Sequence, residues 1–358
     1  MKISVCMIVL NEEEVIERVL TCAKKFADEI ILVDTGSCDK TVEKARKFTD
    51  KIFNFKWNYD FSKARNFAFS KASCDYLFWL DADDFITDEN VEKILKLKEE
   101  KAPKDTYMFK YLCGFTPQNK PSLTFYRERL VKNCPLARFK GAVHEVIIPF
   151  GKIEYSHVEI EHRKQRFISN KRNLKIYGKM GNFKSFSTRD IYYFGKEYYY
   201  NGYYFSAVKV LKEYLKREDC YSPDLKDSLI TLYECSKILN YKNPQKYLLL
   251  ALEKVSLDSV LLCKLGDYFY IEKQIEKAID FYEFALNFSP CNEGFVYQEY
   301  YHLYPLLQLT KLYYEIGKID ISRYYHYKCL SQNPLDERVI YNEKFFNNNE
   351  NNLKILKF

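Results

Sequence analysis

The stretch that decides the fold runs from Tyr76 to Phe85 and reads YLFWLDADDF. Its first half is apolar and aromatic, as in a buried β-strand, and three carboxylates follow at Asp81, Asp83 and Asp84. Like charges this close repel one another unless a cation, or a metal bound to phosphate, neutralises them. The stretch therefore predicts a strand whose end carries a cation-binding group of carboxylates.

The chain before this stretch alternates between β-branched and amphipathic segments. Strand patterns lie at 3–10, 29–36, 51–57 and 75–83, and helix patterns lie at 13–26, 39–50 and 61–72. We expect Asp39 to cap the second of these helices. Such alternation predicts a parallel sheet covered by helices, in which ligands bind at the carboxyl ends of the strands. Asp34, Asp81 and Asp83 would lie at those ends.

From about residue 187 onward, helices rich in tyrosine replace the strand patterns. A repeat near the tetratricopeptide (TPR) period of about 34 residues fits this half of the chain. Its clearest copy spans 259–290, other copies lie upstream and downstream, and a weaker copy lies at 232–251. The positions that mark the three main copies are Gly195, Tyr198, Gly202, Ala207, Gly266, Ala278, Ala285, Pro290, Tyr313, Gly317 and Pro334. We expect an all-α helical-repeat solenoid, with an unrelated helical bundle as the alternative.

The patterns divide the 358 residues into an α/β domain at 1–160, a basic linker at 161–186, TPR-like repeats at 187–340 and a polar tail at 341–358. Two domains agree with this length. Between Glu161 and Asp190 the chain has nine Lys or Arg and no acidic residue. This stretch is either a solvated linker or a contact with anionic lipid, phosphate or an acidic substrate.

The composition argues against several classes of protein. Hydrophobic residues make up 47% and charged residues 29%, as in a globular chain. No apolar run reaches the roughly 18 residues of a membrane span, and the N-terminal MKISVCMIVLN indicates a first strand rather than a signal peptide. Eleven cysteines without a CxxC pair argue against a zinc site or a disulfide framework, and favour a reducing cytosol.

Several segments carry a family resemblance when they are taken together. They are SVCMIVLNEEEVIERVL at 4–20, ADEIILVDTGSCDKTVEKA at 27–45, WNYDFSKARNFAFSKA at 57–72, DYLFWLDADD at 75–84 and FKGAVHEVI at 139–147. They resemble the nucleotide-binding half of family 2 glycosyltransferases with the GT-A fold. The chain is most similar to the branch that contains lipopolysaccharide-core glucosyltransferase-like proteins and the peptide S-glycosyltransferases that modify bacteriocins. The resemblance implies a UDP-sugar donor and Mn²⁺ or Mg²⁺ as cofactor.

The resemblance also implies roles for residues of a donor site. Asp81, the first Asp of the DxD pattern, would lie near the ribose, and Asp83 would bind the metal, with Asp84 as a weaker candidate. The alternative is that these residues only cap a turn. Asn11 and Glu12 would face the base and the ribose.

Further donor contacts would come from Asp34 and from the third helix. Asp34 would accept a hydrogen bond from the uracil imide, because a carboxylate is an acceptor. Lys63 and Arg65 would face the base or the diphosphate, or else be surface charges of an amphipathic helix. The aromatic residues around them are expected in the core: Trp57, Phe61, Phe67 and Phe69.

The segment RFKGAVHEVI supplies the expected base. By resemblance, Glu145 takes the proton of the acceptor and His144 contacts the metal or the diphosphate. Neighbouring residues of a strand point to opposite faces, so both side chains can aim inward only from a loop. A structural ion pair or a hydrogen-bonded histidine is the alternative.

Together these features predict a metal-dependent, inverting hexosyltransferase in the cytoplasm, with a location at the inner face of the membrane left open. The acceptor is a protein or peptide recruited by the repeats, or a lipid-linked or cell-envelope glycan approached through a membrane contact at 162–189. A homodimer through the repeats is a competing explanation of the second half.

Three other classes compete with an active glycosyltransferase. A degenerate transferase head on a TPR scaffold is disfavoured by the intact Asp34, Asp81 and Asp83. A nucleotidyltransferase is disfavoured because no Gly-rich phosphate loop follows the first strand. A nucleic-acid binder is disfavoured because the basic stretch contains no known recognition module.

Overall fold

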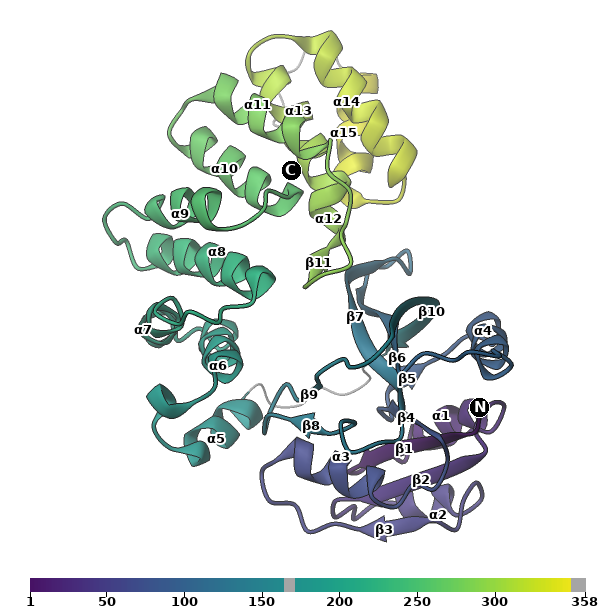
Figure 1. Ribbon diagram of the computed structural model, residues 1–358. Coiled ribbons are helices and arrows are strands. Elements are labelled where there is room, and N and C mark those ends of the chain that lie inside the picture. The colour runs from purple at the N-terminus through teal and green to yellow at the C-terminus, as the bar shows by residue number, and fades with distance from the viewer. Residues whose placement is uncertain (164–170, 349–358) are drawn as a thin grey trace. The chain divides into compact units, whose positions relative to one another are not determined.

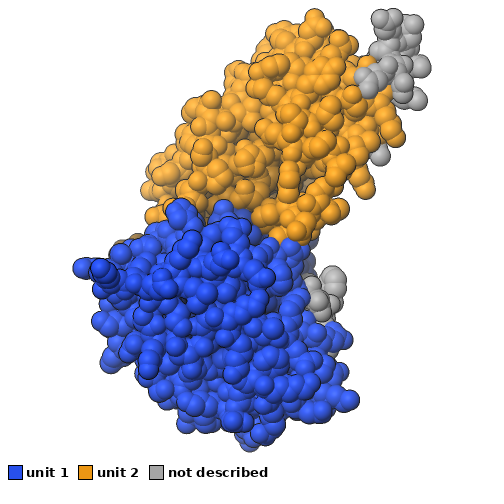
Figure 2. Space-filling model, turned by 90° about the vertical axis from the view of Figure 1, so that its right-hand side faces the viewer, with its two compact units in different colours: residues 1–114, 124–217 blue, residues 115–123, 218–358 orange. Residues whose placement is uncertain are grey.

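The computed structural model describes residues 1–163 and 171–348, so parts of the predicted linker and tail lie outside the described residues. The chain divides into two compact units, which Figure 2 shows in different colours. Unit 1 comprises residues 1–114 and 124–217, and unit 2 comprises residues 115–123 and 218–358. The division at residue 217 differs from the predicted start of the repeat domain at residue 187.

Unit 1 is built on a mixed β-sheet with the strand order β3-β2-β1-β4-β7-β6-β10-β5 (Figure 1). The strands are β1 (Ile3–Val9), β2 (Glu29–Asp34), β3 (Ile52–Asn54), β4 (Tyr76–Leu80), β5 (Asp84–Phe85), β6 (Thr106–Phe115), β7 (Pro121–Lys132) and β10 (Ile153–His162). A separate small sheet pairs β8 (Phe139–Lys140) with β9 (Val146–Ile147). The segment between β8 and β9 contains the predicted base.

The strands β3, β2, β1 and β4 are parallel, as the sequence predicts. All residues of β2 and β4 are buried, which is typical of parallel strands covered on both faces. β7 pairs with β4 in the antiparallel direction, which the sequence did not predict. This strand matters for the site because it brings arginines next to the end of β4.

Two clusters of buried side chains cover the two faces of this sheet. Successive residues of β4 alternate between them, with Phe78 in the first cluster and Trp79 in the second. The helices that contribute are α1 (Ile16–Ala23), α2 (Thr41–Ala45) and α4 (Asp88–Lys98) in the first cluster and α3 (Phe61–Phe69) in the second. The carboxyl end of β4 is thereby held between two packed layers.

The predicted cap of the second helix needs a small correction. The N-cap position of α2 is Lys40, which makes no side-chain cap. The Asp39 carboxylate still accepts a hydrogen bond from the backbone N–H of Thr41 at 2.9 Å. Asp39 therefore satisfies a donor of the first turn from one position earlier than the usual cap.

Unit 1 continues beyond the sheet into three helices, α5 (Lys171–Met180), α6 (Thr188–Tyr200) and α7 (Tyr204–Tyr214), with a short 3₁₀ turn at Phe183–Ser185. The predicted linker therefore contains the helix α5. α6 and α7 form the hairpin predicted as the first repeat, and they approach closely at Gly195, where an added β-carbon would collide with the Leu211 side chain. The repeat pattern thus begins inside unit 1.

Unit 2 consists mainly of helices paired as hairpins, as predicted for TPR-like repeats (Figure 1). The pairs are α8 (Ser222–Ile238) with α9 (Lys246–Lys254), α10 (Ser259–Ile271) with α11 (Ile275–Ala285), and α13 (Leu303–Glu315) with α14 (Ile319–Gln332). The other elements are β11 (Val296–Tyr297), α12 (Gln298–Tyr301) and α15 (Glu337–Asn348). Across residues 1–163 and 171–348, no helix is both long and apolar enough for a membrane span.

Candidate active site

A cavity of about 660 Å³ opens at the carboxyl ends of β1 and β4 in unit 1. Its walls come from these strand ends, from the segment between β8 and β9, from β7, from the end of β10 and from the start of α5. Polar and aromatic lining residues include Asn11, Glu12, Trp57, Phe61, Arg65, Asp81, Asp83, Tyr111, Arg127, Arg129, His144, Glu145, His162, Arg172 and Asn173.

Asp84 holds the turn that follows β4. Its Oδ2 accepts hydrogen bonds from Arg129 Nη1 at 2.8 Å and from the backbone N–H of Asp81 at 2.9 Å. Its Oδ1 accepts a hydrogen bond from the Tyr111 hydroxyl at 2.6 Å. Burial raises the pKa of Asp84, Arg129 acts in the opposite direction, and the charge of Asp81 adds to the rise. Asp84 is only 1% exposed, so it holds the shape of this turn and does not face the cavity.

A buried arginine joins the first Asp of the DxD pattern to the predicted base. Arg65 Nη2 donates to Asp81 Oδ1 at 2.7 Å, and Arg65 Nε donates to Glu145 Oε1 at 2.6 Å. The guanidinium carbon lies 4.7 Å from the centroid of the Trp79 ring. Burial acts to lower the pKa of Arg65, but the charges of Asp81 and Glu145 outweigh it and raise the pKa. Burial acts to raise the pKa of Asp81, and Arg65 with Arg129 brings it below its usual value.

Asp83 lies beside a histidine that the sequence did not single out. β10 pairs with β5 so that His162 stands opposite Asp84, and His162 Nδ1 lies 3.4 Å from Asp83 Oδ1. Burial acts to lower the pKa of His162, but the hydrogen bond and the charge of Asp83 raise it above the usual value. Candidate ligand atoms of Asp83, Asp84 and His162 lie within 4.8 Å of one another. The Asp84 side chain is fully buried, whereas Asp83 and His162 are partly exposed, with His162 Nδ1 also 2.9 Å from the Tyr111 hydroxyl. Asp83 and His162 are therefore the pair best placed to hold a divalent cation.

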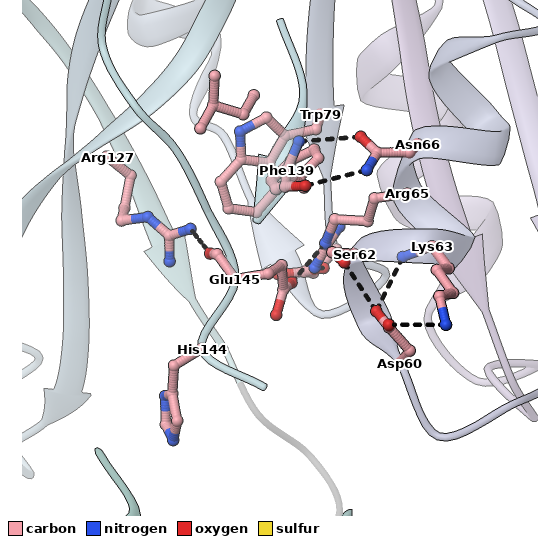
Figure 3. Close-up of polar contacts among 12 residues, drawn as sticks. Asp60, Ser62, Lys63, Arg65, Asn66, Trp79, Arg127, Phe139, His144 and Glu145 are labelled. Carbon is pink, nitrogen blue, oxygen red and sulfur yellow. Dashed lines mark hydrogen bonds and ion pairs between the residues drawn. The ribbon is translucent and has the colours of Figure 1, made fainter. Parts of the chain in front are cut away.

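His144 and Glu145, in the turn before β9, point in different directions (Figure 3). His144 has a φ of 51°, in the left-handed region that non-glycine residues rarely adopt. Its Nε2 lies 2.8 Å from Glu197 Oε1 of α6, and its ring stacks on Tyr193 with centroids 4.2 Å apart. Glu145 points to Arg65, and in the described part of the chain its second oxygen, Oε2, has no hydrogen bond.

Asn11 and Glu12 follow β1 and line the cavity. Asn11 has a φ of 55°, and its Oδ1 accepts a hydrogen bond from the backbone N–H of Cys38 at 2.8 Å. The backbone N–H of Glu12 donates to Thr41 Oγ1 at 2.7 Å. These bonds fix the end of β1 against the segment after β2.

Asp34 ends β2 but is not part of the cavity wall. It is 7% exposed, and its carboxylate accepts hydrogen bonds from the backbone N–H groups of Gly36 at 3.3 Å and Ser37 at 3.1 Å. Gly36 has a φ of 117°, which a glycine adopts without strain. The next residue, Thr35, lines the cavity instead.

Lys63 and Arg65 lie on the same helix but differ in position. The Lys63 side chain is 64% exposed, and its Nζ lies 3.4 Å from Asp60 Oδ2 of the helix cap (Figure 3). It does not line the cavity. Arg65, two residues later, is 7% exposed and points inward.

Two of the four aromatic residues expected in the core lie elsewhere. Phe67 and Phe69 pack in the second cluster of the sheet, as expected. Trp57 and Phe61 line the cavity instead, with ring centroids 4.8 Å apart. The reason is that α3 begins only at Phe61, so both residues lie at the entrance to the helix and not on its packed face.

The basic cavity residues that the sequence did not single out are Arg127, Arg129, His162 and Arg172. Arg127 and Arg129 are two apart on β7 and therefore point to the same face of the strand. Arg127 Nη2 donates to the backbone oxygen of Glu145 at 2.9 Å. Arg127 and Arg129 could have been recognised from the sequence, because they occupy alternate positions of a β pattern. For His162 and Arg172 the only signal in the sequence was the basic stretch.

Comparisons with known proteins find similarity to glycosyltransferases and to a TPR repeat-containing protein. Residues 4–140 match the family model described as Glycosyl transferase family 2. A TPR repeat-containing protein of Synechococcus elongatus is 33% identical over 151 residues, which are 41% of this chain and 35% of that protein. The SPbeta prophage-derived glycosyltransferase SunS of Bacillus subtilis is 32% identical over 143 residues, 39% of this chain and 33% of SunS. The match thus spans about a third of the length of each of these relatives.

Weaker similarities extend to other proteins. The lipopolysaccharide core biosynthesis glycosyltransferase LpsC of Rhizobium meliloti is 27% identical over 169 residues, 42% of this chain and 58% of LpsC. Among solved structures, pilF of Pseudomonas aeruginosa is 17% identical with a TM-score of 0.39, over 50% of this chain and 74% of pilF. Glucosyl-3-phosphoglycerate synthase of Mycobacterium tuberculosis, solved with Mg²⁺ and UDP, is 20% identical with a TM-score of 0.26, over 32% and 43%.

Proposed function

We propose that the chain transfers a sugar from a UDP-sugar with the help of Mn²⁺ or Mg²⁺, because residues 4–140 match the glycosyl transferase family 2 model and TPR-like helical hairpins follow them. The observation that supports this most is the group of acidic residues at the cavity. Asp81 and Asp83 lie at the end of β4, and Glu145 reaches the same cavity from the turn before β9.

We assign the metal to Asp83 and His162. A carboxylate oxygen and an imidazole nitrogen together suit Mn²⁺, and the carboxylate suits Mg²⁺. When bound, the metal would act as a Lewis acid that neutralises the diphosphate. The resemblance implied His144 as the second ligand, but the contact of His144 with Glu197 and the position of His162 beside Asp83 favour His162.

The donor would occupy the side of the cavity near β1. We propose that Asn11 and Glu12 contact the base and ribose, and that Asp81 contacts the ribose, because these residues line the cavity. Arg65 would serve the base or the diphosphate only through Nη1, because its Nε and Nη2 already donate to Glu145 and Asp81. The predicted contact of Asp34 with the uracil ring would require the ring to reach the turn that the Asp34 carboxylate holds. The predicted donor contact of Lys63 is not supported, because the Lys63 side chain is exposed.

Glu145 remains our candidate for the base. Its Oε1 is held by Arg65, and its Oε2 is available to take the proton of the acceptor. The acceptor oxygen or sulfur then attacks the anomeric carbon from the face opposite UDP, and the bond to UDP breaks with its electron pair leaving on UDP. One displacement of this kind inverts the configuration and needs no covalent intermediate.

The acceptor would be a protein or peptide, or a lipid-linked or cell-envelope glycan. The hairpins of unit 2 favour a polypeptide, because helical repeats present extended binding surfaces. A homodimer through the repeats, a peripheral membrane contact within 162–189 and a cytoplasmic location are further proposals. The last rests only on the cysteine composition, and residues 164–170 of the basic stretch lie outside the described residues.

Calorimetric titration of UDP-sugars, with and without Mn²⁺, tests the proposed function. The wild type is expected to bind with Mn²⁺, and Asp83→Ala is expected to lose at least about tenfold in affinity. Asp88→Ala is the matched control, because its side chain is 84% exposed and removes the same charge away from the cavity. A wild type that binds no nucleotide sugar would overturn the proposal and favour a degenerate head on a TPR scaffold.

A further inference from the structure

The start of helix α5 brings to the cavity an arginine, Arg172, that forms no ion pair within the part of the chain that the structure describes. Arg172 lines the cavity, and its guanidinium carbon lies 4.8 Å from the centroid of the Phe61 ring. The other lining arginines each pair with an acid: Arg65 with Asp81 and Glu145, Arg127 with Glu128, and Arg129 with Asp84. Among residues 1–163 and 171–348, no carboxylate forms an ion pair with Arg172, and its Nε donates only a long hydrogen bond of 3.5 Å to Asn173 Oδ1.

The neighbouring residue fixes this turn of the helix in place. Asn173 Nδ2 donates to Glu197 Oε1 at 2.7 Å, and the same oxygen lies 2.8 Å from His144 Nε2. Glu197 is 7% exposed, and Ile176 of α5 is buried as well. α5 is therefore tied to α6 and to the turn that carries the proposed base, so packed elements set the position of the Arg172 backbone, while the Arg172 side chain is exposed at the cavity wall.

The ligand for this arginine follows from the charges of the cavity. A divalent cation on Asp83 would draw a diphosphate to the carboxyl end of β4, and one cation does not neutralise a departing nucleoside diphosphate. A guanidinium forms paired hydrogen bonds to phosphate oxygens, and its planar fork makes it better suited to this than an ammonium group. Arg172 supplies such a group at the wall of the same cavity.

We propose that Arg172 is a catalytic residue that binds the diphosphate of the donor and stabilises it as the leaving group. The inference rests on the proposed function and adds a residue from outside the matched family domain, which ends at residue 140. When the bond between the anomeric carbon and the diphosphate oxygen breaks, its electron pair stays on that oxygen. Arg172 donates hydrogen bonds to the diphosphate as this charge develops and gives up no proton.

Titrations of the full-length chain with UDP and with uridine, both in the presence of Mn²⁺, test this role. Uridine lacks the diphosphate, so it reports on the base and ribose contacts alone. The variants are Arg172→Ala, Arg172→Lys and, as matched control, Lys175→Ala, which removes an equal charge from an exposed position of the same helix outside the cavity wall.

We expect Arg172→Ala to raise the Kd of UDP at least about tenfold and to leave the Kd of uridine within a factor of about two. Arg172→Lys should fall between the wild type and Arg172→Ala, because a lysine keeps the charge but not the fork. Lys175→Ala should bind both ligands as the wild type does.

Two results would overturn the inference while the proposed function stands. One is a wild type that binds UDP and an Arg172→Ala variant no weaker than Lys175→Ala. The other is an Arg172→Ala variant that loses UDP and uridine equally, since the helix and not the guanidinium would then be responsible. A wild type that binds neither ligand overturns the proposed function itself.

Discussion

Asp83 and Asp84 are adjacent in the chain but differ in burial and in partners. The Asp83 side chain is 25% exposed and faces His162, whereas the Asp84 side chain is fully buried and paired with Arg129. A buried charge pair is costly to break, because removing one partner leaves the other charge unpaired in a poorly solvated environment. Replacement of Asp84 should therefore mainly lower the stability, whereas replacement of Asp83 should mainly weaken ligand binding.

We predict that Asp84→Asn lowers the free energy of unfolding by about 3–5 kcal/mol, because Arg129 loses its buried counter-charge. Asp83→Asn should change it by less than about 1 kcal/mol, because a partly exposed pair contributes little. Urea unfolding followed by circular dichroism measures both values. Equal losses for the two variants would contradict the division between a supporting and a ligand-binding carboxylate.

The sequence identified some residues of the cavity and missed others for a physical reason. Carboxylates that follow a buried strand form a local pattern, so Asp81 and Asp83 could be recognised. His162 reaches Asp83 only because β10 pairs with β5, and that pairing joins segments far apart in the chain. Arg172 reaches Phe61 only because α5 packs in unit 1. Local periodicity carries no information on either contact.

At the scale of elements, the helical hairpins depend on glycines at close contacts. Gly266 of α10 faces Tyr282 of α11, and an added β-carbon would lie 2.7 Å from Tyr282 Cζ. Gly178 of α5 is also helical, but an added β-carbon there would meet nothing within 4 Å. Both positions gain helix propensity when glycine is replaced by alanine, so only the packing differs.

We predict that Gly266→Ala lowers the free energy of unfolding by about 1–3 kcal/mol, because a buried tyrosine ring must shift. Gly178→Ala should raise it by about 0.5–1 kcal/mol, because alanine favours the helix at an open position. Thermal or urea unfolding of both variants measures the difference. A Gly266→Ala variant as stable as the wild type would show that the hairpin adjusts to the added methyl group without cost.

At the scale of the whole molecule, the sequence predicted the order of architectures but not the boundary between the units. The change from strands to helices marks residue 187, yet α6 and α7 belong to unit 1. A hairpin pattern shows that two helices pack together and does not show which domain they join. Here α6 joins unit 1 because Glu197 and Tyr193 contact His144, and Arg189 donates to the His144 backbone oxygen at 3.3 Å.

Two truncations of the chain separate these boundaries. A chain that ends at Arg217 keeps α5, α6 and α7, and we expect it to bind UDP with Mn²⁺ within a factor of about two of the full chain. A chain that ends at Phe186 loses the contacts of α6 with His144, and the loss of Glu197 also frees Asn173. We expect this shorter chain to bind UDP at least about tenfold more weakly or to lose its folded circular dichroism spectrum. Equal UDP affinity of the two chains would place the boundary of the donor-binding domain at residue 187, as the sequence predicted.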